Sequence, residues 1–420
     1  MKIAVLGEPR YDSPIKHFVN ENVRLPNHII QGFKPSAEDD LLFELAGARE
    51  KIYFDPLQTR VGIVTCGGLC PGLNDVIRSL YLELHYAYGV GEVLGFLGGY
   101  RGLDPVLGKE PLRLTTKLVD GIQQKGGTIL GTSRGPVDVS KAVDNLIKRG
   151  VNILFTVGGD GTQRGGNALY QEAKNRGYAL SVVGIPKTID NDVAFVSRTF
   201  GYGTAVDEAT KVLDRAHTEA RSVENGISLI KLMGRHAGFI AAGATVASQD
   251  VNFLLVPEVP FKLDGPRGFL AALKERILDR AHAVIVVAEG AGQDLLTSSA
   301  GKRDASGNVK MKDIGLFLRE RIEKYFKAEG IPMVMRYFDP SYLIRSSRAN
   351  AEDSILCDLF ARNAVHAAMA GKTGLVIGYL HNQFIHVPIE LLAGRQKTLD
   401  TKGLGWIAAL AATGQPERFE

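Results

Sequence analysis

Two short apolar runs, each followed at once by an acidic, glycine-rich loop, constrain the fold of this chain more than any other feature. Residues 152–157 (NILFTV) lead into Gly158-Gly159-Asp160-Gly161-Thr162, and residues 180–185 (LSVVGI) lead into the heptad 186–192 (PKTIDND). Continuous apolar runs of this length are typical of strands buried on both faces of a parallel sheet. Such sheets bind ligands at the carboxyl ends of adjacent strands. The pattern therefore predicts an α/β fold with a ligand site within residues 158–192.

The residue types in these loops suit phosphoryl transfer. Glycines let backbone N–H groups approach phosphate oxygens, and aspartates can hold Mg²⁺ or accept a proton. Asp160 is placed to hold Mg²⁺, and Gly161 leaves room beside a phosphoryl donor. Asp190 and Asp192 stand two residues apart, and in extended backbone they would point the same way. One could then take a hydroxyl proton while the other orients metal or water.

Length and charge bound this interpretation. With 420 residues the chain is long enough for two or more domains. Lys and Arg number 50 against 46 Asp and Glu, a formal net charge of +4 that is too balanced to indicate a nucleic-acid or membrane partner. No apolar stretch reaches the length of about 18 residues that a membrane-spanning helix needs. The first seven residues lack the features of a signal peptide, so we expect a cytoplasmic protein.

The three cysteines, Cys66, Cys70 and Cys357, do not suggest a disulfide framework or a zinc site. We expect them to be small buried residues in a reducing compartment.

Strands and helices alternate regularly from Arg60 onward. A strand at 61–65, a Gly/Pro loop at 66–72 and a helix at 74–84 come first, and a second series begins near Gly201. This alternation predicts two doubly wound, Rossmann-like α/β domains with mostly parallel sheets and the active site in the cleft between them. The expected segments are an N-terminal arm (1–58), a first domain (59–200, completed by about 346–395), a second domain (201–345) and a C-terminal tail (396–420).

Further elements are expected along the chain. Residues 293–312 are expected to form a mobile surface loop, and residues 375–388 a strand-turn-strand unit. Expected helices span 203–222 and about 266–280, 313–327 and 350–370, and expected strands span 227–232, 253–257, 283–288 and 333–337.

Two other loops are candidate phosphate sites. Residues 67–74 (GGLCPGLN) join a strand to a helix N-terminus, which attracts anions. This is not a Walker A loop, because no Gly-Lys-Ser/Thr closes it, and a plain tight connection is an equally open interpretation. Arg134, within Gly131–Gly135, could bridge phosphate oxygens with its guanidinium or simply lie at the surface.

Taken together and in this order, the motifs resemble the 6-phosphofructokinase family over residues 52–388. The resemblance is to its longer ATP-dependent group, of the plant and trypanosomatid type. The segments typical of that group are residues 52–56 (IYFDP) and 161–166 (GTQRGG).

The resemblance implies a nucleotide domain at 59–200 and a sugar-phosphate domain at 201–345. It places Mg²⁺ at Asp160, the catalytic base at Asp190 and an assisting carboxylate at Asp192. The residues implied to bind the donor are Gly67, Gly68, Arg134, Gly135, Gly159, Asp160, Gly161, Thr162 and Lys187. The residues implied to bind the sugar phosphate are Thr188, Ile189, Asp190, Met233, Gly234, Arg235, Glu289, Arg336, Tyr342 and Arg345.

The implied reaction is phosphorylation of D-fructose 6-phosphate at its C1 hydroxyl, with ATP as donor and Mg²⁺ as cofactor. Asp190 removes the hydroxyl proton, and Arg235 faces the transferring phosphoryl group. In the family the counterpart of Arg336 usually comes from a neighbouring subunit, which implies a homo-oligomer, a dimer or a tetramer. Two positions depart from short bacterial members, which have histidine in place of Tyr342 and arginine in place of Gly226.

The identity of the donor depends on two positions. Pyrophosphate-dependent relatives usually have aspartate in place of Gly161 and lysine at the position of Lys187, so this chain combines the two patterns. We favour ATP, since an aspartate at 161 would repel the α-phosphate whereas a lysine excludes nothing. The alternatives are a pyrophosphate-dependent enzyme, a kinase of another acceptor, and a non-catalytic regulatory subunit. The last would be marked by loss of Asp160, Asp190 or Arg235, all of which are present.

Three residues outside these motifs carry simpler expectations. His381 and His386 are expected to be exposed polar residues of the strand-turn-strand unit. Trp406 is expected to anchor the C-terminal segment on a core.

Overall fold

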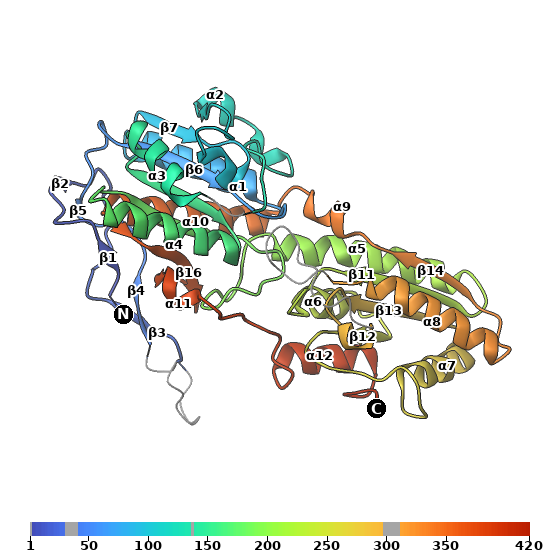
Figure 1. Ribbon diagram of the computed structural model, residues 1–420. Helices are drawn as coiled ribbons and strands as arrows, with labels where there is room; N and C mark the ends of the chain where they lie inside the picture. Colours follow the sequence, from blue (N-terminus) through green and yellow to red (C-terminus); the bar gives the residue numbers. More distant parts are fainter. Residues whose placement is uncertain (1, 30–40, 136–137, 297–310) are drawn as a thin grey trace. The chain divides into compact units, whose positions relative to one another are not determined.

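The computed structural model describes residues 2–29, 41–135, 138–296 and 311–420. The chain divides into two compact units, each of which is discontinuous in sequence. Unit 1 comprises residues 1–188, 193–201 and 346–396, and unit 2 comprises residues 189–192, 202–345 and 397–420. Figure 1 traces the elements of both. The sequence-based expectation of doubly wound α/β architecture with mostly parallel sheets is confirmed.

Unit 1 is built on a sheet that has nine strands in the described part of the chain, in the order β3-β4-β17-β16-β10-β9-β6-β7-β8. Its middle is parallel, and the strands at both margins are antiparallel. Every residue of β9 and β10 is buried, as their continuous apolar sequence requires. The strands are β3 (Arg24–Pro26), β4 (Leu42–Leu45), β6 (Arg60–Thr65), β7 (Glu92–Gly95), β8 (Leu112–Arg113), β9 (Ile153–Gly158), β10 (Ser181–Pro186), β16 (Leu375–Leu380) and β17 (Gln383–Pro388).

Helices cover the parallel strands of unit 1. The chain moves outward from β6 in one direction to β7 and in the other to β9 and β10, so right-handed crossovers place helices on both faces. A core that includes Phe96, Leu154 and Leu169 fills the space under α3 and α4, whereas α10 packs on α1, β10 and β16. The helices are α1 (Leu73–Leu82), α2 (Thr116–Val119), α3 (Val139–Lys148), α4 (Asp160–Asn175), α10 (Ala351–Met369) and α11 (Ile389–Leu392).

The N-terminal residues extend unit 1. β4 pairs with β17, and β3 pairs with β4, so residues expected to form an arm add strands to the sheet. Two small antiparallel pairs complete the unit: β1 (Ala4–Val5) with β15 (Lys372–Thr373), and β2 (Tyr11–Asp12) with β5 (Lys51–Ile52).

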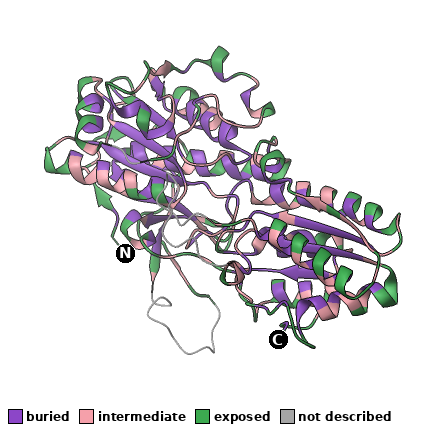
Figure 2. Cartoon of the chain, turned by 45° about the vertical axis from the view of Figure 1, so that its right-hand side comes forward, coloured by how far each residue is buried: buried purple, intermediate pink, exposed green. Residues whose placement is uncertain are grey.

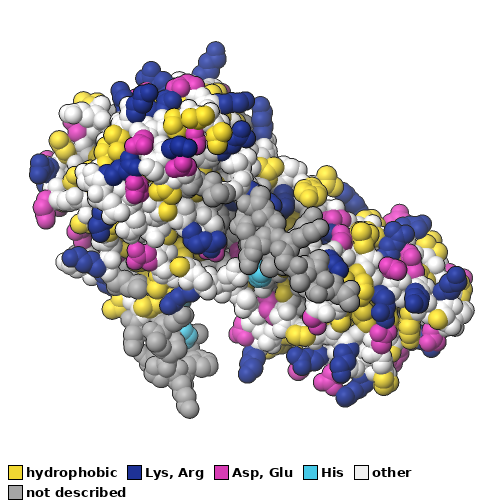
Figure 3. All heavy atoms as spheres, in the orientation of Figure 1, with side chains coloured by type: hydrophobic (Ala, Val, Ile, Leu, Met, Phe, Trp, Pro, Cys, Tyr) yellow, Lys and Arg dark blue, Asp and Glu magenta, His cyan; other side chains and the backbone are white. Residues whose placement is uncertain are grey.

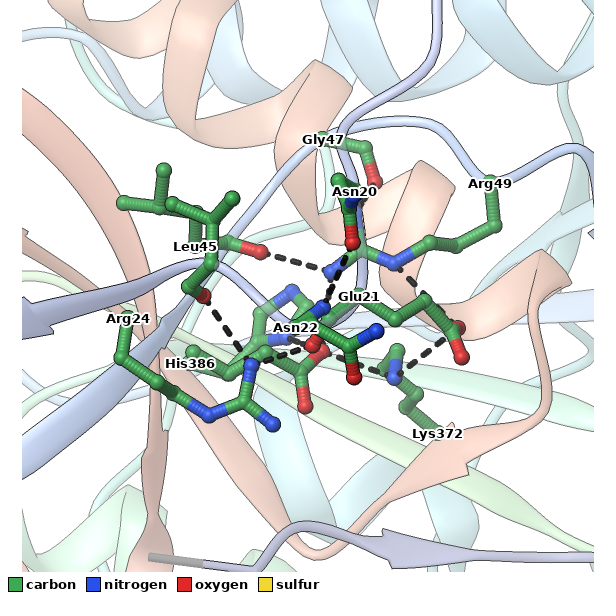
Figure 4. Close-up of polar contacts among 11 residues, drawn as sticks. Asn20, Glu21, Asn22, Arg24, Leu45, Gly47, Arg49, Lys372 and His386 are labelled. Carbon is green, nitrogen blue, oxygen red and sulfur yellow. Dashed lines mark hydrogen bonds and ion pairs between the residues drawn. The ribbon is translucent and has the colours of Figure 1, made fainter.

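The expectation that His386 is exposed was wrong: it is fully buried in β17. Its Nδ1 lies 3.0 Å from Oε1 of Glu44 on the paired strand β4. Glu44 also accepts hydrogen bonds from Arg49 and Lys372, both at 2.8 Å. Figure 4 labels Arg49, Lys372 and His386 among the polar contacts of this region. Burial lowers the pKa of His386 to about 4. His381, by contrast, is exposed, as expected.

Unit 2 is built on a parallel sheet with four strands in the described residues, in the order β12-β13-β11-β14. α7 and α8 enclose a core around Ile285, Leu273 and Phe326, and α5 and α6 pack on each other and on β13. Figure 2 shows buried strands and exposed outer faces of helices. The elements are β11 (Gly226–Leu232), β12 (Phe253–Leu255), β13 (His282–Ala288), β14 (Val334–Phe338), α5 (Tyr202–Arg221), α6 (Phe239–Ser248), α7 (Phe269–Arg280), α8 (Ile314–Ala328), α9 (Ser341–Arg345) and α12 (Leu404–Thr413).

The C-terminal segment is part of unit 2. Trp406 is buried and α12 packs on α6, which confirms its expected anchoring role. The side-chain amide of Gln415 binds the backbone of Leu254 twice, accepting its N–H at 2.6 Å and donating to its carbonyl at 3.1 Å. Residues 297–310, most of the expected surface loop, lie outside the described residues.

Surface and cysteine features agree with the sequence. Basic and acidic side chains are interspersed on the face drawn in Figure 3. All three cysteines are free thiols and buried, as expected. In the described part of the chain no helix is long and apolar enough to cross a membrane.

Candidate active site

Three loops of unit 1 meet at the carboxyl ends of adjacent strands. β9 pairs with β6 on one side and with β10 on the other, so Thr65, Val157 and Ile185 lie side by side. The strand order changes direction between β6 and β9, and such a switch point is where open α/β sheets bind ligands. We call this region the glycine edge, defined by Gly67, Gly68, Gly158–Thr162 and Lys187.

Hydrogen bonds join these loops to the segment that contains Arg134. The N–H of Gly67 donates to the carbonyl of Ser133 at 3.1 Å, and the hydroxyl of Thr132 donates to the carbonyl of Gly67 at 2.6 Å. Arg134 and Gly135 are exposed beside this connection. The structure therefore brings the predicted arginine next to the predicted glycine loop.

Lys187 fastens the glycine edge together. Its buried ammonium donates to the carbonyl of Gly68 at 2.7 Å, and its backbone N–H donates to the carbonyl of Gly158 at 3.1 Å. This one residue, placed directly after β10, thus contacts the loops that follow both β6 and β9.

Helix α4 begins at the glycine edge. Gly159 is its N-cap and Asp160 its first residue, so unpaired N–H groups and the positive end of the helix dipole lie here. The carboxylate of Asp160 lies 2.5 Å from the guanidinium of Arg164, and both side chains are well exposed. A Cβ built on Gly161 would meet only Arg164, at 3.7 Å, so the fold itself leaves room for a side chain.

No multi-residue metal site is present in the part of the chain that the structure describes, if three or more His, Cys, Asp or Glu side chains are required. Asp160 would supply one carboxylate to a metal that takes its other ligands from phosphate and water, which is the mode typical of Mg²⁺.

A second group of predicted residues meets in unit 2, at the carboxyl ends of β11 and β13. The N–H of Glu289 donates to the carbonyl of Leu232 at 2.9 Å, and that of Gly290 donates to Gly234 at 3.0 Å. Gly234 has φ +128, and a Cβ there would lie 2.6 Å from the carbonyl oxygen of Ala237. Only glycine fits this turn, which presents the next residue, Arg235, to Asp190.

The carboxyl group of Asp190 has a strongly shifted pKa. Its Oδ2 accepts the backbone N–H of Arg235 at 3.4 Å. Burial, together with the charges of Asp192 and Glu289, raises the pKa of Asp190 to about 7, although Arg345 acts in the opposite direction. We call Asp190, Asp192, Arg235 and Glu289 the carboxylate edge. A carboxyl group with this pKa can exchange a proton near neutral pH.

The expected extended geometry of residues 190–192 was wrong. Asn191 has φ +57, in the left-handed region, so strand alternation does not apply to its two neighbours. Asp192 instead turns so that its carbonyl accepts the N–H of Lys397 at 2.9 Å. The charge of Asp192 still contributes to the raised pKa of Asp190.

Other predicted sugar-phosphate residues are spread over unit 2 and its boundary. Arg336 pairs in register with Ser228, about 13 Å along the strand from Leu232, and it is exposed with its Nε 3.8 Å from Glu219. Tyr342 on α9 is 79% exposed. Met233 and Ile189 are buried in unit 2, whereas Thr188 belongs to unit 1, where its carbonyl accepts the hydroxyl of Thr199.

Sequence reasoning missed two residues near the carboxylate edge. Lys397 contacts Asp192 through its backbone, places its ammonium 5.1 Å from the centre of the Phe239 ring, and has a pKa that burial lowers to about 8. Glu258 accepts the N–H groups of Gly238, at the start of α6, and of Leu399. Neither lies in a local motif, so the sequence offered no signal.

Comparisons with known proteins show the family to which the chain belongs. A family model described as phosphofructokinase matches residues 60–368. The ATP-dependent 6-phosphofructokinase of Borreliella burgdorferi is 44% identical and covers 99% of this chain and 96% of its own. That of Trypanosoma brucei brucei is 48% identical, covering 89% of this chain and 76% of its own. A pyrophosphate-dependent phosphofructokinase from Marinobacter aquaeolei shares the fold, with a TM-score of 0.70 at 21% identity, over 86% of this chain and 93% of that one.

Proposed function

Because the chain belongs to the phosphofructokinase family, we propose that it transfers the γ-phosphoryl group of ATP to the C1 hydroxyl of D-fructose 6-phosphate, a step of glycolysis. The names of its relatives support both the donor and the acceptor. The observation that carries the mechanism is the buried carboxyl of Asp190, with a pKa of about 7 and a hydrogen bond from the Arg235 backbone.

Asp190 acts as the general base. It takes the proton from the C1 hydroxyl as that oxygen attacks the γ-phosphorus, and a base with a pKa near the working pH is best suited to this task. Burial, together with the charges of Asp192 and Glu289, keeps the pKa of Asp190 high. Glu289 accepts hydrogen bonds from sugar hydroxyls. Arg235 and Arg345 offset the negative charge, of the phosphoryl group and of the 6-phosphate respectively.

The glycine edge binds the donor phosphates. The loop at Gly67 and Gly68, the N-terminus of α4 and the guanidinium of Arg134 provide the donor site without a Walker A lysine. The N–H of Gly67 is used within the protein, since it donates to Ser133. Stabilisation of charge on the phosphoryl oxygens is where most of the catalysis lies in reactions of this type.

Asp160 is the residue that would hold Mg²⁺. Its exposed carboxylate at the first position of α4 lies where donor phosphates approach the helix N-terminus. The ion, when bound, neutralises charge on the phosphate oxygens.

ATP is favoured over pyrophosphate by two observations. Lys187 donates to the carbonyl of Gly68, so it has a role in holding the loops that does not require pyrophosphate. A Cβ on Gly161 would meet no protein atom other than Arg164, so packing within the fold does not require glycine at this position. The need to leave room for a nucleotide does explain a glycine at position 161.

We also propose that the enzyme is a homo-oligomer. Arg336 is exposed on β14, an edge strand, and lies away from the carboxylate edge of its own sheet. It is therefore available to a second copy of the chain. Sedimentation of the purified protein tests this, and a monomer at assay concentration would refute it.

The decisive experiment measures fructose 1,6-bisphosphate formation from fructose 6-phosphate and Mg²⁺, with ATP or pyrophosphate as donor. We expect turnover with ATP. Turnover with pyrophosphate alone would keep the acceptor assignment and overturn the donor assignment. Absence of product with either donor would favour a non-catalytic regulatory subunit.

A further inference from the structure

A partly buried lysine on β11 joins three elements of unit 2. The ammonium of Lys231 donates to Oδ2 of Asp313 at 2.6 Å and to Oδ2 of Asp339 at 2.9 Å. Its side chain is only 12% exposed. Burial alone would lower the pKa of Lys231, but the hydrogen bonds that its ammonium donates to the two aspartates outweigh burial and raise that pKa, so the lysine stays charged.

Each partner of Lys231 is itself fixed at the start of an element. Asp313 caps α8, accepting the N–H of Leu316 at 3.1 Å, and it also accepts the hydroxyl of Tyr337 at 3.2 Å. Asp339 precedes α9 and accepts the hydroxyl of Ser341 at 2.6 Å. With both carboxylates oriented in this way, the lysine joins β11 to the starts of α8 and α9.

The joined elements carry residues of the proposed acceptor site. β11 continues beyond Lys231 into the turn whose Arg235 N–H binds Asp190. α9 ends at Arg345, whose charge acts on Asp190. The ion pair between Lys231 and Asp339 therefore connects the strand that holds the base to the helix that holds its cationic neighbour.

We propose that Lys231 is a positioning residue: through Asp339 it sets the place of α9, and hence of Arg345, relative to Asp190. The proposal rests on the proposed function, because Arg345 is assigned there to the 6-phosphate. Lys231 itself does not contact substrate. Both aspartates are about one third exposed, at 34% and 31%. Ion pairs that solvent reaches usually contribute little to stability, so a purely stabilising role predicts a small change in Tm and no change in KM.

The test compares Lys231→Met, Lys231→Arg and Lys211→Met. Lys211 forms exposed ion pairs with Asp207 and Glu208 on α5 and is a matched control. In Lys231→Met we expect KM for fructose 6-phosphate to rise about tenfold, with kcat and KM for ATP within about twofold, as loss of ground-state binding requires. The acid limb of the pH profile of kcat/KM should move to higher pH. Displacement of Arg345 takes a positive charge away from Asp190 and so raises its pKa further. Lys231→Arg should restore both quantities, and Lys211→Met should change neither.

A second pair of variants separates positioning from folding. Asp313→Ala and Asp339→Ala each remove one carboxylate from the same lysine, but only Asp339 leads into α9. We expect Asp339→Ala to raise KM for fructose 6-phosphate and Asp313→Ala to lower thermal stability without that rise. Equal effects of the two variants on KM, or an unchanged KM in both, would overturn the proposal. This pair also decides the matter if Lys231→Met does not fold.

The proposal can be judged apart from the enzyme activity. Amide hydrogen exchange of residues 339–345 should be faster in Lys231→Met, or in Asp339→Ala, than in Lys211→Met. If the wild-type protein shows no turnover, the proposed function fails while the exchange result still tests the link to α9. Unchanged exchange in an active enzyme would refute the positioning role alone.

Discussion

The glycine edge and the carboxylate edge occupy the same place in two sheets of similar design, yet their electrostatics are opposite. At the glycine edge, small residues expose backbone N–H groups, and the buried charge is the cation Lys187. At the carboxylate edge, burial and the charges of two neighbouring carboxylates raise the pKa of Asp190 to about 7. The comparison teaches that the topology of a parallel sheet fixes where a site lies. The residues that follow each strand then decide whether that site binds an anion or accepts a proton from a hydroxyl group.

The largest expected effect comes from removing the base at the carboxylate edge. Asp190→Asn should lower kcat by roughly 10²–10⁴-fold, the usual contribution of a general base, with little change in KM for fructose 6-phosphate. The wild-type rate should also decline below about pH 7, as Asp190 takes up a proton. Steady-state kinetics across pH check both points, with Asp207→Asn on the exposed face of α5 as control. Near-normal turnover of Asp190→Asn would show that Asp190 is not the general base and would remove the proposed difference between the two edges.

Placing a carboxylate at the glycine edge should have the next largest effect. Gly161→Asp should raise KM for ATP by at least about tenfold, since two unit charges about 4 Å apart repel by about 1 kcal/mol in bulk water and by more near a protein surface. The fold has room for this side chain, so stability should be unaffected.

Gly161→Ala separates size from charge in this test and should have a smaller effect than Gly161→Asp. If Gly161→Asp uses ATP as well as the wild type does, anion binding at the glycine edge is refuted.

A moderate effect is expected from Lys187. Lys187→Met removes the hydrogen bond to Gly68, and a hydrogen bond to a charged group contributes about 1.5–3 kcal/mol. Loosening of the loops should raise KM for ATP severalfold and leave KM for fructose 6-phosphate unchanged. Lys141→Met, an exposed change on α3, serves as the control. An equal rise in both KM values would show that Lys187 does not act at one edge alone.

The smallest effect concerns stability at the carboxylate edge. The folded pKa of Asp190, about 7, is above its ordinary value of 3.8. Between these values the folded state binds more protons than the unfolded state, so this carboxyl group makes stability fall as pH rises toward 7. Asp190→Asn should therefore raise Tm by a few degrees at pH 8 and by less near pH 4.5. A change in Tm that does not depend on pH would contradict the raised pKa of Asp190 in the folded state.

Much of the fold could be predicted, because its central parallel strands coincide with continuous apolar segments of the sequence. The parallel strands β9, β10, β11 and β13 lie within a residue or two of their expected bounds. The short strands β3 and β4 were not expected, since β4 pairs with β17, more than 300 positions away, and β3 in turn pairs with β4. His386 was misjudged for the same reason: the partner that permits its burial, Glu44, is distant in sequence.

The candidate site was predictable in composition but less so in geometry. Local motifs identified the glycine loops and the carboxylates, and the structure brings each set together at a strand end. The left-handed Asn191 was missed, although asparagine is among the residues that tolerate this conformation. The contact of Lys397 with Asp192 and the ion pairs of Lys231 join separate segments, which no local pattern can reveal.

The paired hydrogen bonds between Gln415 and Leu254 have a consequence for how the protein behaves in concentrated solution. β12 lies at the margin of its sheet, and an open margin is a template on which strands of other molecules can add. One side-chain amide imitates a neighbouring strand and occupies both backbone groups of Leu254. At Leu254, Gln415 thus leaves no backbone group on this side of β12 for a strand of another molecule, a role that is separate from catalysis.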